Sequence, residues 1–457
     1  MGRDMKTGAA PLHAELPLAL HEGGSLARAD FWRRVHGLTV AVAAHPARRW
    51  ALVCEDSAWF AAGLFALGRL RRGIVLPQAP QAGSLAASGA QIDAVLTDQP
   101  QAFSDYPHLS VLQGTPAGDA TPFLPDDDVL TESYTSGSSG APKCVLKSFA
   151  QLRLEVAALE REWGAQLGDA LVIGTVPHHH LYGLLVRVLW PLLAGRPFLT
   201  RTCLQPAELR GWARSRRCIL VSSPAFLSRI TDCAVLPEAT RIAAVFSSGA
   251  PLPDDCARML KHDWGHAPIE IYGSTETGGI AWRAWSGAEQ RPWWQRLNGV
   301  GIELREEDAG ARLWVKSDFT WRHDWMATGD LAQLAPDGRF RLLGRADDVV
   351  KFEDKRVSLS EMRTRLTAHE WVQDARLLLV AGRRTVIGAV VILNDAGRAA
   401  FTGSGKLAVR EALRAWLRQS YEPILIPRKW RFPEHLPDND MGKIEHARLQ
   451  GLFERQA

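Results

Sequence analysis

The feature that most constrains the fold is a repeated alternation of helix-like and strand-like segments over the first part of the chain. Apolar residues recur at helical spacing within residues 58–71 and again within residues 149–163. Short apolar runs typical of buried strands occur at residues 73–76, 93–97, 110–112, 171–175, 219–222 and 243–246. Helices that alternate with buried strands predict α/β layers around largely parallel sheets.

The pattern changes after Gly338. Strand-like runs follow at residues 340–343, 376–380 and 386–393, and helix-like segments at residues 360–367, 406–419 and 445–453. They fit a compact α+β unit of about a hundred residues, which is an ordinary domain size. We therefore expect a large N-terminal domain over residues 1–343, a boundary at residues 344–347 and a small C-terminal domain over residues 348–457.

Length and composition exclude several classes of protein. The 457 residues exceed one ordinary core, and 46% hydrophobic with 23% charged residues is typical of soluble globular proteins. A formal net charge of only +4 gives no reason to expect a nucleic-acid partner. The most apolar segment, residues 181–199, is interrupted by Arg187, Pro191 and Arg196, so it predicts a buried helix and turn rather than a membrane span.

Cysteine spacing and the N-terminal residues bear on the compartment. The six cysteines show no Cys-x-x-Cys pair and no spacing typical of a metal site. They are expected to be reduced thiols, as in cytosolic proteins. The opening residues MGRDMKTGAAPLHAEL contain no apolar run of the kind found in signal peptides. We therefore expect a cytoplasmic protein.

Residues 134–143, YTSGSSGAPK, are the first candidate site. A strand-like run precedes them, and an apolar run and a helix-capping pattern, Ser148 with Gln151, follow them. A loop rich in glycine and hydroxyl groups between two strands can bind phosphate through its backbone N–H groups, and Lys143 adds a positive charge. It is not a Walker A loop, because Lys143 does not directly follow Gly140. A flexible linker is the alternative.

Two further turns carry candidate ligand-binding residues. In residues 271–279, IYGSTETGG, Glu276 offers a carboxylate for Mg²⁺ and Tyr272 offers an aromatic face for a flat ring. Residues 247–253, SSGAPLP, form a glycine–proline turn after a buried strand. The alternatives are a capped helix start or plain turn for the first segment and an ordinary loop for the second.

The C-terminal third contains an acidic residue and a lysine of interest. Asp330 can accept hydrogen bonds from two vicinal hydroxyl groups, as acidic residues do with ribose, and Arg345 can donate from the other side. Lys443 follows a polar turn and precedes a helix-like segment. The alternatives are a surface turn near Gly338 and a lysine that is simply solvated.

The segment VPHHHLYG, residues 176–183, invites a metal-binding interpretation. Three consecutive histidines cannot all face one point on a strand or helix, and no acidic or cysteine partner lies nearby at a ligand spacing. Histidine also lines pockets or gates them, and this is the interpretation we favour for His180.

These motifs follow one another in an order that resembles the adenylate-forming superfamily, which comprises acyl- and aryl-CoA synthetases, peptide-synthetase adenylation domains and luciferases. The resemblance runs from about Leu67 to Leu449. It implies a large domain of layered α/β subdomains, a mobile α+β domain at the C-terminus, and ATP with Mg²⁺ as cofactors. The residues that it assigns to the phosphate loop are Thr135, Ser136, Gly137, Ser138, Ser139, Gly140 and Lys143.

The same resemblance assigns the remaining site residues. It implies Asp347 as the hinge and Lys443 as the lysine used in adenylation, with catalytic roles also for Thr275, Glu276 and His180. The implied metal ligand is Glu276. The implied nucleotide-binding residues are Gly249, Ala250, Pro251, Tyr272, Gly273, Ser274, Asp330 and Arg345. The implied acid pocket is lined by His180, Tyr182, Phe226, Ser248 and Gly278.

The sequence departs from the family pattern at several positions. Ser139 stands where threonine is usual, Cys144 and Ser248 replace glycines, and Asp354 in KFEDKRVSLSEM replaces the glycine of K-x-x-G-x-R-[IV]. In the family this last turn lies beside the tunnel for the pantetheine arm, so this departure argues against specificity for CoA. The form of this loop and the short chain resemble ligases that load aryl acids onto acyl carrier proteins in aryl-polyene, xanthomonadin-type pathways.

The resemblance implies two half-reactions. A carboxylate attacks the α-phosphorus of ATP to give acyl-AMP and pyrophosphate, and a phosphopantetheine thiol then takes the acyl group and releases AMP. We expect an acyl carrier protein as acceptor and an aryl, hydroxybenzoate-like acid as substrate. An acyl- or aryl-CoA synthetase is one alternative, and an inactive nucleotide- or acyl-binding protein is another.

A basic stripe is expected on the helix-like segment 406–419. Arg410, Arg414 and Arg418 recur every four residues, opposite an apolar face. Such a stripe can attract an acidic carrier-protein helix, although a merely solvated face is the alternative.

Overall fold

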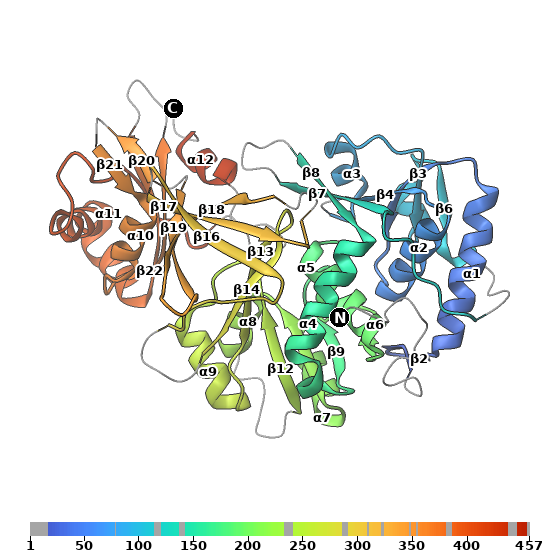
Figure 1. The fold of residues 1–457 in the computed structure, drawn as a ribbon. Coiled ribbons are helices and arrows are strands. Elements are labelled where there is room, and N and C mark those ends of the chain that lie inside the picture. The colour runs from blue at the N-terminus through green and yellow to red at the C-terminus, as the bar shows by residue number, and fades with distance from the viewer. Residues whose placement is uncertain are drawn as a thin grey trace. The chain divides into compact units, whose positions relative to one another are not determined.

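The computed structural model describes most of the chain (Figure 1). The described residues are 17–77, 79–113, 120–136, 142–232, 241–285, 291–308, 310–320, 324–346, 349–352, 355–380, 386–436 and 446–454. Packing divides the chain into two compact units, Met1–Gly301 with Lys316–Trp325, and Ile302–Val315 with Met326–Ala457. Residues 326–343 therefore pack with the C-terminal unit. The boundary at residues 344–347 concerns a hinge and stays a prediction.

The first sheet of the N-terminal unit has six strands in the order β6-β5-β3-β4-β7-β8. All neighbours are parallel except the final β7–β8 hairpin. The strands are β3 (Arg49–Val53), β4 (Gly73–Leu76), β5 (Ala94–Thr97), β6 (His108–Ser110), β7 (Leu130–Ser136) and β8 (Pro142–Ser148). Every residue of β5 is buried, as expected for a strand covered on both faces. The predicted strand at residues 110–112 is wrong in part, because η2 (Val111–Gln113) is a 3₁₀ turn.

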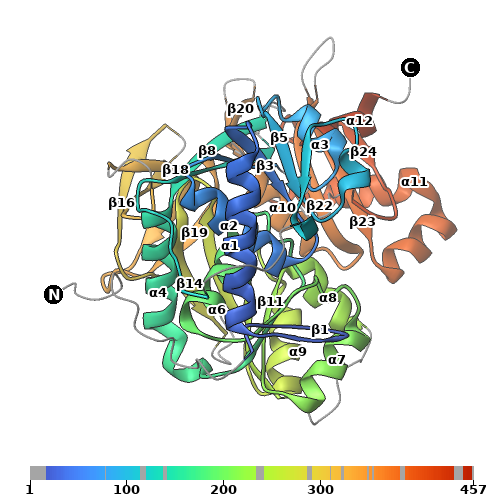
Figure 2. The same ribbon diagram turned by 90° about the vertical axis from the view of Figure 1, so that its right-hand side faces the viewer.

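Helices precede or connect the strands β3, β4 and β5. They are α1 (Arg28–Ala44), α2 (Ser57–Arg69) and α3 (Ala82–Ala87). Figure 2 shows α1 and α2 side by side. The Asp56 carboxylate accepts hydrogen bonds from the backbone N–H groups of Ala58 and Trp59, which fixes the start of α2. The helix predicted at residues 58–71 is thereby confirmed within two residues at each end.

The second sheet has nine strands in the order β15-β14-β13-β12-β11-β9-β10-β1-β2. Its central strands, from β13 to β1, are parallel. The strands are β1 (Ala19–His21), β2 (Gly24–Leu26), β9 (Leu171–Gly174), β10 (Phe198–Leu199), β11 (Cys218–Ser222), β12 (Ile242–Ser247), β13 (Ile269–Ser274), β14 (Gly278–Ala284) and β15 (Gln295–Arg296). The predicted buried strands at residues 171–175, 219–222 and 243–246 are confirmed as β9, β11 and β12.

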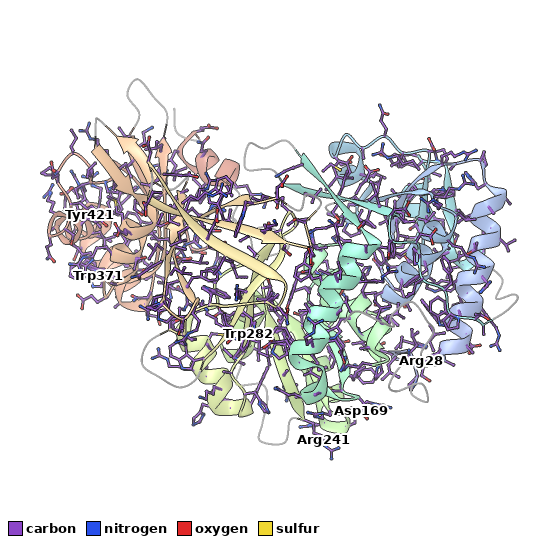
Figure 3. All side chains as sticks on the ribbon, viewed as in Figure 1. Arg28, Asp169, Arg241, Trp282, Trp371 and Tyr421 are labelled. Atoms are coloured by element: carbon purple, nitrogen blue, oxygen red, sulfur yellow. The ribbon has the colours of Figure 1, made fainter. Side chains whose placement is uncertain are left out.

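Helices cover both faces of this sheet. One face buries an apolar cluster against α7 (Pro206–Ser215), α8 (Pro224–Asp232) and α9 (Asp254–Trp264). On the other face the rings of Trp163 and Trp190 from the covering helices pack edge-on against Phe246 of β12. Trp282 of β14, labelled in Figure 3, packs against Trp163 at 5.6 Å between ring centroids. These rings fix the position of the long helix that follows the β7–β8 hairpin.

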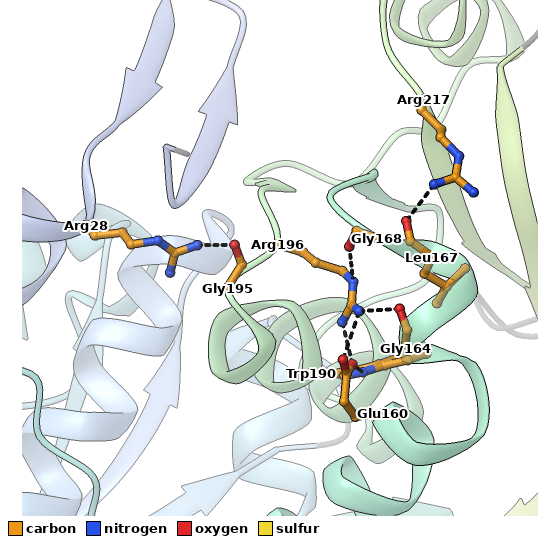
Figure 4. A network of polar contacts seen from close by, with 9 residues as sticks. All are labelled: Arg28, Glu160, Gly164, Leu167, Gly168, Trp190, Gly195, Arg196 and Arg217. Carbon is orange, nitrogen blue, oxygen red and sulfur yellow. Dashed lines mark hydrogen bonds and ion pairs between the residues drawn. The ribbon is translucent and has the colours of Figure 1, made fainter. Parts of the chain in front are cut away.

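That helix is α4 (Phe149–Leu167), and both of its ends are capped. Ser148 and Gln151 form the predicted capping box. At the other end the Arg196 guanidinium donates to the carbonyls of Gly164 and Gly168 and to both carboxylate oxygens of Glu160 (Figure 4). Arg217 adds a hydrogen bond to the Leu167 carbonyl. Arginines thus satisfy carbonyls that the end of a helix leaves without partners.

The predicted buried helix and turn at residues 181–199 form α5 (Leu181–Gly183), η3 (Leu184–Leu189), α6 (Trp190–Ala194) and β10. The η3 segment is a π-helix, and its Arg187 is fully buried. Arg187 donates hydrogen bonds to the Val176 carbonyl and the Thr202 hydroxyl. These bonds stabilise its buried charge. Among the described residues, no helix has the length and apolarity that crossing a membrane requires.

Over its described residues, the C-terminal unit contains three antiparallel or mixed sheets. The strands are β16 (Val300–Glu307), β17 (Gly310–Ser317), β18 (Met326–Leu334), β19 (Phe340–Arg345), β20 (Val349–Phe352), β21 (Lys355–Ser358), β22 (Val372–Val380), β23 (Val386–Leu393) and β24 (Lys429–Arg431). They form the sheets β16-β17-β18-β19, β20-β21 and β22-β23-β24. The strands β16, β17 and β18 were not predicted, and the predicted strand at 340–343 is the edge of their sheet.

The helices in the described part of this unit are α10 (Leu359–Thr367), α11 (Asp395–Arg418) and α12 (His446–Glu454). The predicted helix at residues 406–419 is the second half of α11, which breaks at Gly405, where φ is +83°. Trp371 and Tyr421, labelled in Figure 3, pack against the apolar cluster between α10, α11 and β22–β23. This cluster gives the unit its own hydrophobic core.

Candidate active site

The two strongest sequence motifs meet at an ion pair between Lys143 and Glu276. Lys143 lies near the start of β8, and Glu276 lies in the turn between β13 and β14. Lys143 Nζ donates a hydrogen bond of 2.8 Å to Glu276 Oε1. The Lys143 side chain is 59% exposed and that of Glu276 is 33% exposed, so the pair is open to solvent. The structure thus brings the lysine of the predicted phosphate loop to the predicted Mg²⁺ ligand.

The Glu276 carboxylate is held in its charged form. Burial alone would raise its pKa, but the hydrogen bonds from Lys143 and from the Glu276 backbone outweigh burial, and the pKa lies below its ordinary value. A charged carboxylate suits a hard divalent cation, and the neighbouring ammonium suits phosphate oxygens. The residues present therefore fit a complex of Mg²⁺ with a triphosphate.

The turn that carries Glu276 is tightly built. The Ser274 backbone N–H donates to Thr277 Oγ1 at 3.0 Å, and the Thr277 N–H donates to Ser274 Oγ at 3.2 Å. Thr275 is half-buried within this turn. Gly278 has a φ of +69°, and a Cβ atom on Gly273 would lie 2.2 Å from the Gly278 carbonyl oxygen. Larger residues at these two glycines would displace the turn.

Two charged residues that sequence reasoning missed lie beneath this turn. Lys147 of β8 is 1% exposed, and its Nζ donates to the carbonyl oxygens of Glu276 at 3.2 Å and Phe319 at 2.5 Å. Glu155 of α4 is 5% exposed, and its Oε1 accepts from the Gly279 N–H at 2.6 Å. No sequence pattern marked either residue, because their burial became visible only with the fold.

The predicted adenine-binding segments are neighbours. Ser248 Oγ donates to the Ile271 carbonyl at 2.8 Å, so the turn after β12 lies beside the end of β13. Gly249, Ala250 and Pro251 are exposed there, and Gly249 has a φ of +94°. Tyr272 is half-buried, with its ring 5.5 Å from that of Trp294. The four residues share one edge of the sheet, as the adenine prediction requires, and their role stays a prediction.

The residues predicted for the acid pocket occupy different environments. His180 precedes α5 and is half-buried, and Gly278 is buried above Glu155. Phe226 is 3% exposed and belongs to the apolar cluster behind the nine-stranded sheet. Its side chain is therefore covered in this structure. The pocket assignment stays a prediction for all of them.

Tyr182, also predicted for the pocket, has a buried hydroxyl group. Tyr182 Oη lacks a hydrogen bond of normal geometry, although the Ser222 backbone approaches it. Burial raises the pKa of Tyr182 far above its ordinary value, partly offset by that approach, so the hydroxyl stays protonated. Ser247 Oγ is likewise buried without a hydrogen bond. Ser222 and Ser247 pair in register at the carboxyl ends of β11 and β12.

The histidine cluster shows no sign of a metal centre. Among the described residues, no group of three or more metal-ligating side chains is arranged to hold an ion. His178 is buried against Phe60, and its Nε2 lies 2.9 Å from the Cys54 carbonyl oxygen. Burial lowers the pKa of His178 to about 3, with Arg187 adding to the effect, so its ring is neutral. His178 is a core residue.

The predicted ribose-binding pair lies in the C-terminal unit. Asp330 of β18 and Arg345 of β19 are directly opposite each other in the antiparallel ladder. The Asp330 N–H donates to Thr328 Oγ1 at 3.1 Å. A Cβ atom on Gly329 would lie 2.3 Å from the Arg345 guanidinium carbon, so this glycine makes room for the arginine. Their proximity is as predicted, and ribose binding stays a prediction.

Several predicted residues lie outside the described part of the chain. They are Gly137, Ser138, Ser139, Gly140, Asp347, Asp354 and Lys443. Thr135 and Ser136 belong to β7, where they pair with Lys143 and Pro142 of β8. The roles of all these residues stay predictions.

Comparison with known proteins agrees with the geometry. A family model described as AMP-binding enzyme matches residues 38–309, which is more than half of the chain. A 4-coumarate–CoA ligase of Rhodobacter capsulatus is 29% identical over 312 residues, 68% of this chain and 73% of the relative. An uncharacterized acyl–CoA ligase of Bacillus subtilis is 22% identical over 362 residues, 74% of this chain and 71% of the relative.

Solved structures share the fold over nearly the whole chain. ATP-bound MatB from Rhodopseudomonas palustris has a TM-score of 0.81 at 19% identity, covering 99% of this chain and 98% of that one. The o-succinylbenzoate CoA synthetase MenE from Bacillus subtilis, in complex with AMP, has a TM-score of 0.77 at 17% identity, with 96% of each chain covered. The family match and the similarity to acyl-CoA ligases show that this chain is an AMP-forming acid–thiol ligase that uses ATP with Mg²⁺. The chain belongs to the AMP-binding enzyme family, within the adenylate-forming superfamily.

Proposed function

We propose that this chain activates an aryl acid as its acyl-adenylate and transfers the acyl group to the phosphopantetheine thiol of an acyl carrier protein. The observation that carries the adenylation step is the Lys143–Glu276 pair, because it places an ammonium and a charged carboxylate side by side on the sheet edge. Adenylation joins two anions, so it depends on positive charge and precise positioning around the phosphates.

The chain's own residues divide this task. Lys143 and the backbone N–H groups of residues 137–140 would bind the β- and γ-phosphates. Glu276 would hold Mg²⁺, which neutralises charge on the departing pyrophosphate. Lys443 would approach the α-phosphate and the attacking carboxylate, where a donor stabilises the transition state. Asp330 and Arg345 would hold the ribose hydroxyls.

The buried hydroxyl groups support a hydroxylated aryl acid. Among the described residues, Tyr182 Oη and Ser247 Oγ are both buried and lack a hydrogen bond of normal geometry. Ser247 ends β12 and pairs with Ser222, to whose backbone Tyr182 is close. Carboxyl ends of parallel strands are where ligands bind in open α/β sheets. A ring hydroxyl group would satisfy polar atoms that are costly to leave unpaired.

The acceptor thiol has a second candidate. The named relatives include CoA ligases, and this favours CoA. The carrier protein is favoured by Asp354, which joins Glu353 in the turn that in the family lies beside the thiol tunnel. Two carboxylates there would repel the additional phosphates of CoA more than the single phosphate of a carrier's pantetheine arm.

Pyrophosphate exchange over a panel of acids tests the proposal. The panel contains benzoate, its 3- and 4-hydroxy derivatives, octanoate and malonate. We expect exchange with a hydroxybenzoate, and a preference over benzoate that falls about tenfold in Tyr182→Phe. Exchange with none of the acids would favour an inactive binding protein.

The acceptor is then compared with the preferred acid. Phosphopantetheinylated carrier protein and free CoA are supplied at equal concentrations, and thioester formation is measured for each. Faster turnover with CoA would show the carrier-protein part of the proposal to be wrong and would leave the adenylation part intact.

A further inference from the structure

Two lysines of β8 donate hydrogen bonds to the same glutamate, one to its side chain and one to its backbone. Lys143 and Lys147 are four residues apart on a strand, so their side chains lie on one face. Lys143 Nζ binds the Glu276 carboxylate at 2.8 Å, and Lys147 Nζ binds the Glu276 backbone carbonyl at 3.2 Å. The strand that leaves the phosphate loop therefore fixes both the side chain and the backbone of the predicted Mg²⁺ ligand.

Glu155 holds the other end of the same turn. Its Oε1 accepts from the Gly279 N–H at 2.6 Å. A Cβ atom on Gly278 would lie 2.6 Å from Glu155 Oε2, so the turn backbone rests directly on the carboxylate. Residues 276–279 are thus bound at one end by a buried cation and at the other by a buried anion.

Burying these charges is costly, and a turn does not require them. The hydroxyl groups of Ser274 and Thr277 already show that neutral side chains can satisfy backbone groups here. Lys147 and Glu155 are both at least nine-tenths buried and attract each other electrostatically. Lys147 also binds the Phe319 carbonyl, so one ammonium joins β8, the Glu276 turn and the segment after β17. Charge-assisted bonds are stronger and more directional than neutral ones.

We propose that Lys147 and Glu155 are positioning residues that hold the Glu276 turn at a fixed place beside the phosphate loop, so that Glu276 can bind the divalent cation of the ATP complex. The proposal rests on the proposed function and adds two residues to it. Neither side chain touches substrate. Their effect passes through the backbone of residues 276–279, which sets the direction of the Glu276 carboxylate.

Binding of Mn²⁺ in the presence of ATP, followed by electron paramagnetic resonance, tests this without requiring turnover. Lys147→Met removes the ammonium with little change in volume, and Glu155→Gln keeps an acceptor but removes the charge. The matched control is Glu160→Gln, which changes the same residue type on α4 within the Arg196 network, away from the Glu276 turn. We expect Lys147→Met and Glu155→Gln to weaken Mn²⁺ binding about tenfold or more, because residues that orient a metal ligand have effects of that size.

Pyrophosphate exchange supplies the second readout. The Mg²⁺ concentration for half-maximal exchange should rise by the same factor in both variants and stay at the wild-type value in Glu160→Gln. The thermal unfolding midpoint of each variant is measured as well. All three variants lose charge-assisted hydrogen bonds and are expected to lose stability, but only Lys147→Met and Glu155→Gln are expected to change metal binding. If Lys147→Met does not fold, Glu155→Gln decides the question alone.

Wild-type metal dependence in a folded Lys147→Met or Glu155→Gln protein would overturn the proposal, whatever the change in stability. This result differs from a failure of the proposed function. In that case the wild-type protein itself would show no exchange with any acid, and no tighter binding of Mn²⁺ with ATP than without it.

Discussion

At the scale of single residues, the pair of Lys143 and Glu276 determines how the site responds to pH. The hydrogen bond from Lys143 lowers the pKa of Glu276 against the opposing effect of burial. A lowered pKa keeps the carboxylate charged to a lower pH than an ordinary glutamate, so metal-dependent exchange should persist into moderately acidic solution. Without the Lys143 ammonium, the effect of burial would be opposed less strongly, so the pKa of Glu276 would rise.

Lys143→Met should therefore move the acid limb of the pH–rate profile for pyrophosphate exchange to higher pH, besides lowering the rate. The measurement is exchange against pH at saturating Mg²⁺. Lys406→Met, which changes an exposed lysine of α11, is the control and should leave the profile unchanged. An acid limb at the same pH in Lys143→Met would show that Glu276 is not the titrating group.

Lys443 is expected to serve adenylation alone. Loss of one transition-state donor should lower the rate of acid-dependent pyrophosphate exchange by about 10²–10³ in Lys443→Ala. Transfer from chemically prepared acyl-adenylate to the thiol should remain close to the wild-type rate, because the α-phosphate chemistry is then already complete. Equal losses in the two assays would contradict this assignment.

Sequence reasoning at this scale found the side chains predicted to bind ligands and missed those that contact the backbone behind them. Glu276 and Lys143 lie in motifs with recognisable glycine and hydroxyl neighbours. Lys147 and Glu155 do not, because their role depends on a turn more than a hundred residues away along the chain. Such contacts follow from strand pairing and helix packing, and neither was visible before the fold was known.

At the scale of elements, α4 shows how a buried arginine network secures the helix behind the site. Arg196 is 2% exposed and binds Glu160 together with the carbonyls of Gly164 and Gly168. Arg196→Met should lower the free energy of unfolding by about 2–4 kcal/mol, because it removes a buried ion pair and the partners of the helix end. Urea denaturation measures this. A loss near that of an exposed substitution, about 0.5 kcal/mol or less, would contradict it.

The basic stripe on α11 is weaker than the sequence indicated. Glu411 lies between two of its members and accepts hydrogen bonds from Arg410 and Arg414. These bonds, with Arg410 as the larger influence, lower the pKa of Glu411, so its charge offsets theirs. The helical spacing correctly places the three arginines on one face. It does not show that Glu411, on the same part of the helix, offsets their charge.

Arg418 is thus the member of the stripe best suited to attract an acidic carrier protein. Arg418→Glu should lower the rate of carrier loading and the salt dependence of that rate, while pyrophosphate exchange stays unchanged. Arg398→Glu, at the other end of α11, is the control. Carrier loading at the wild-type rate in Arg418→Glu would leave the stripe as a solvated face.

At the scale of the whole molecule, periodicity predicted strands in the parallel sheets and in the antiparallel pair β22–β23, and it missed β16, β17 and β18. The apolar runs of β5, β9 and β11 are short, continuous and buried on both faces, so they are visible in the sequence. The residues of β16, β17 and β18 are mostly half-buried or exposed and of mixed polarity, which makes these strands hard to tell from loops. Packing places most residues of these strands with the C-terminal unit, and the hinge at residues 344–347 stays a prediction.

The two half-reactions place opposite demands on one molecule, and the hinge predicted at Asp347 would reconcile them. Lys443 is expected to act while the adenylate forms, and the loop at residues 351–357 is expected to serve the thiol afterwards. A rotation of the C-terminal domain about residue 347 would exchange one for the other, and it requires a change of backbone dihedral angles there.

Asp347→Pro tests this, because proline fixes φ near −65° and blocks one of the two arrangements. We expect one half-reaction to slow far more than the other, with pyrophosphate exchange and thiolation of preformed acyl-adenylate measured separately. Asp337→Pro is not a suitable control, since Asp337 accepts a hydrogen bond within its own turn. Asp347→Ala is suitable, because it removes the carboxylate and leaves the backbone free, so it should retain both half-reactions. Equal rates for both steps in Asp347→Pro would place the hinge elsewhere in the chain.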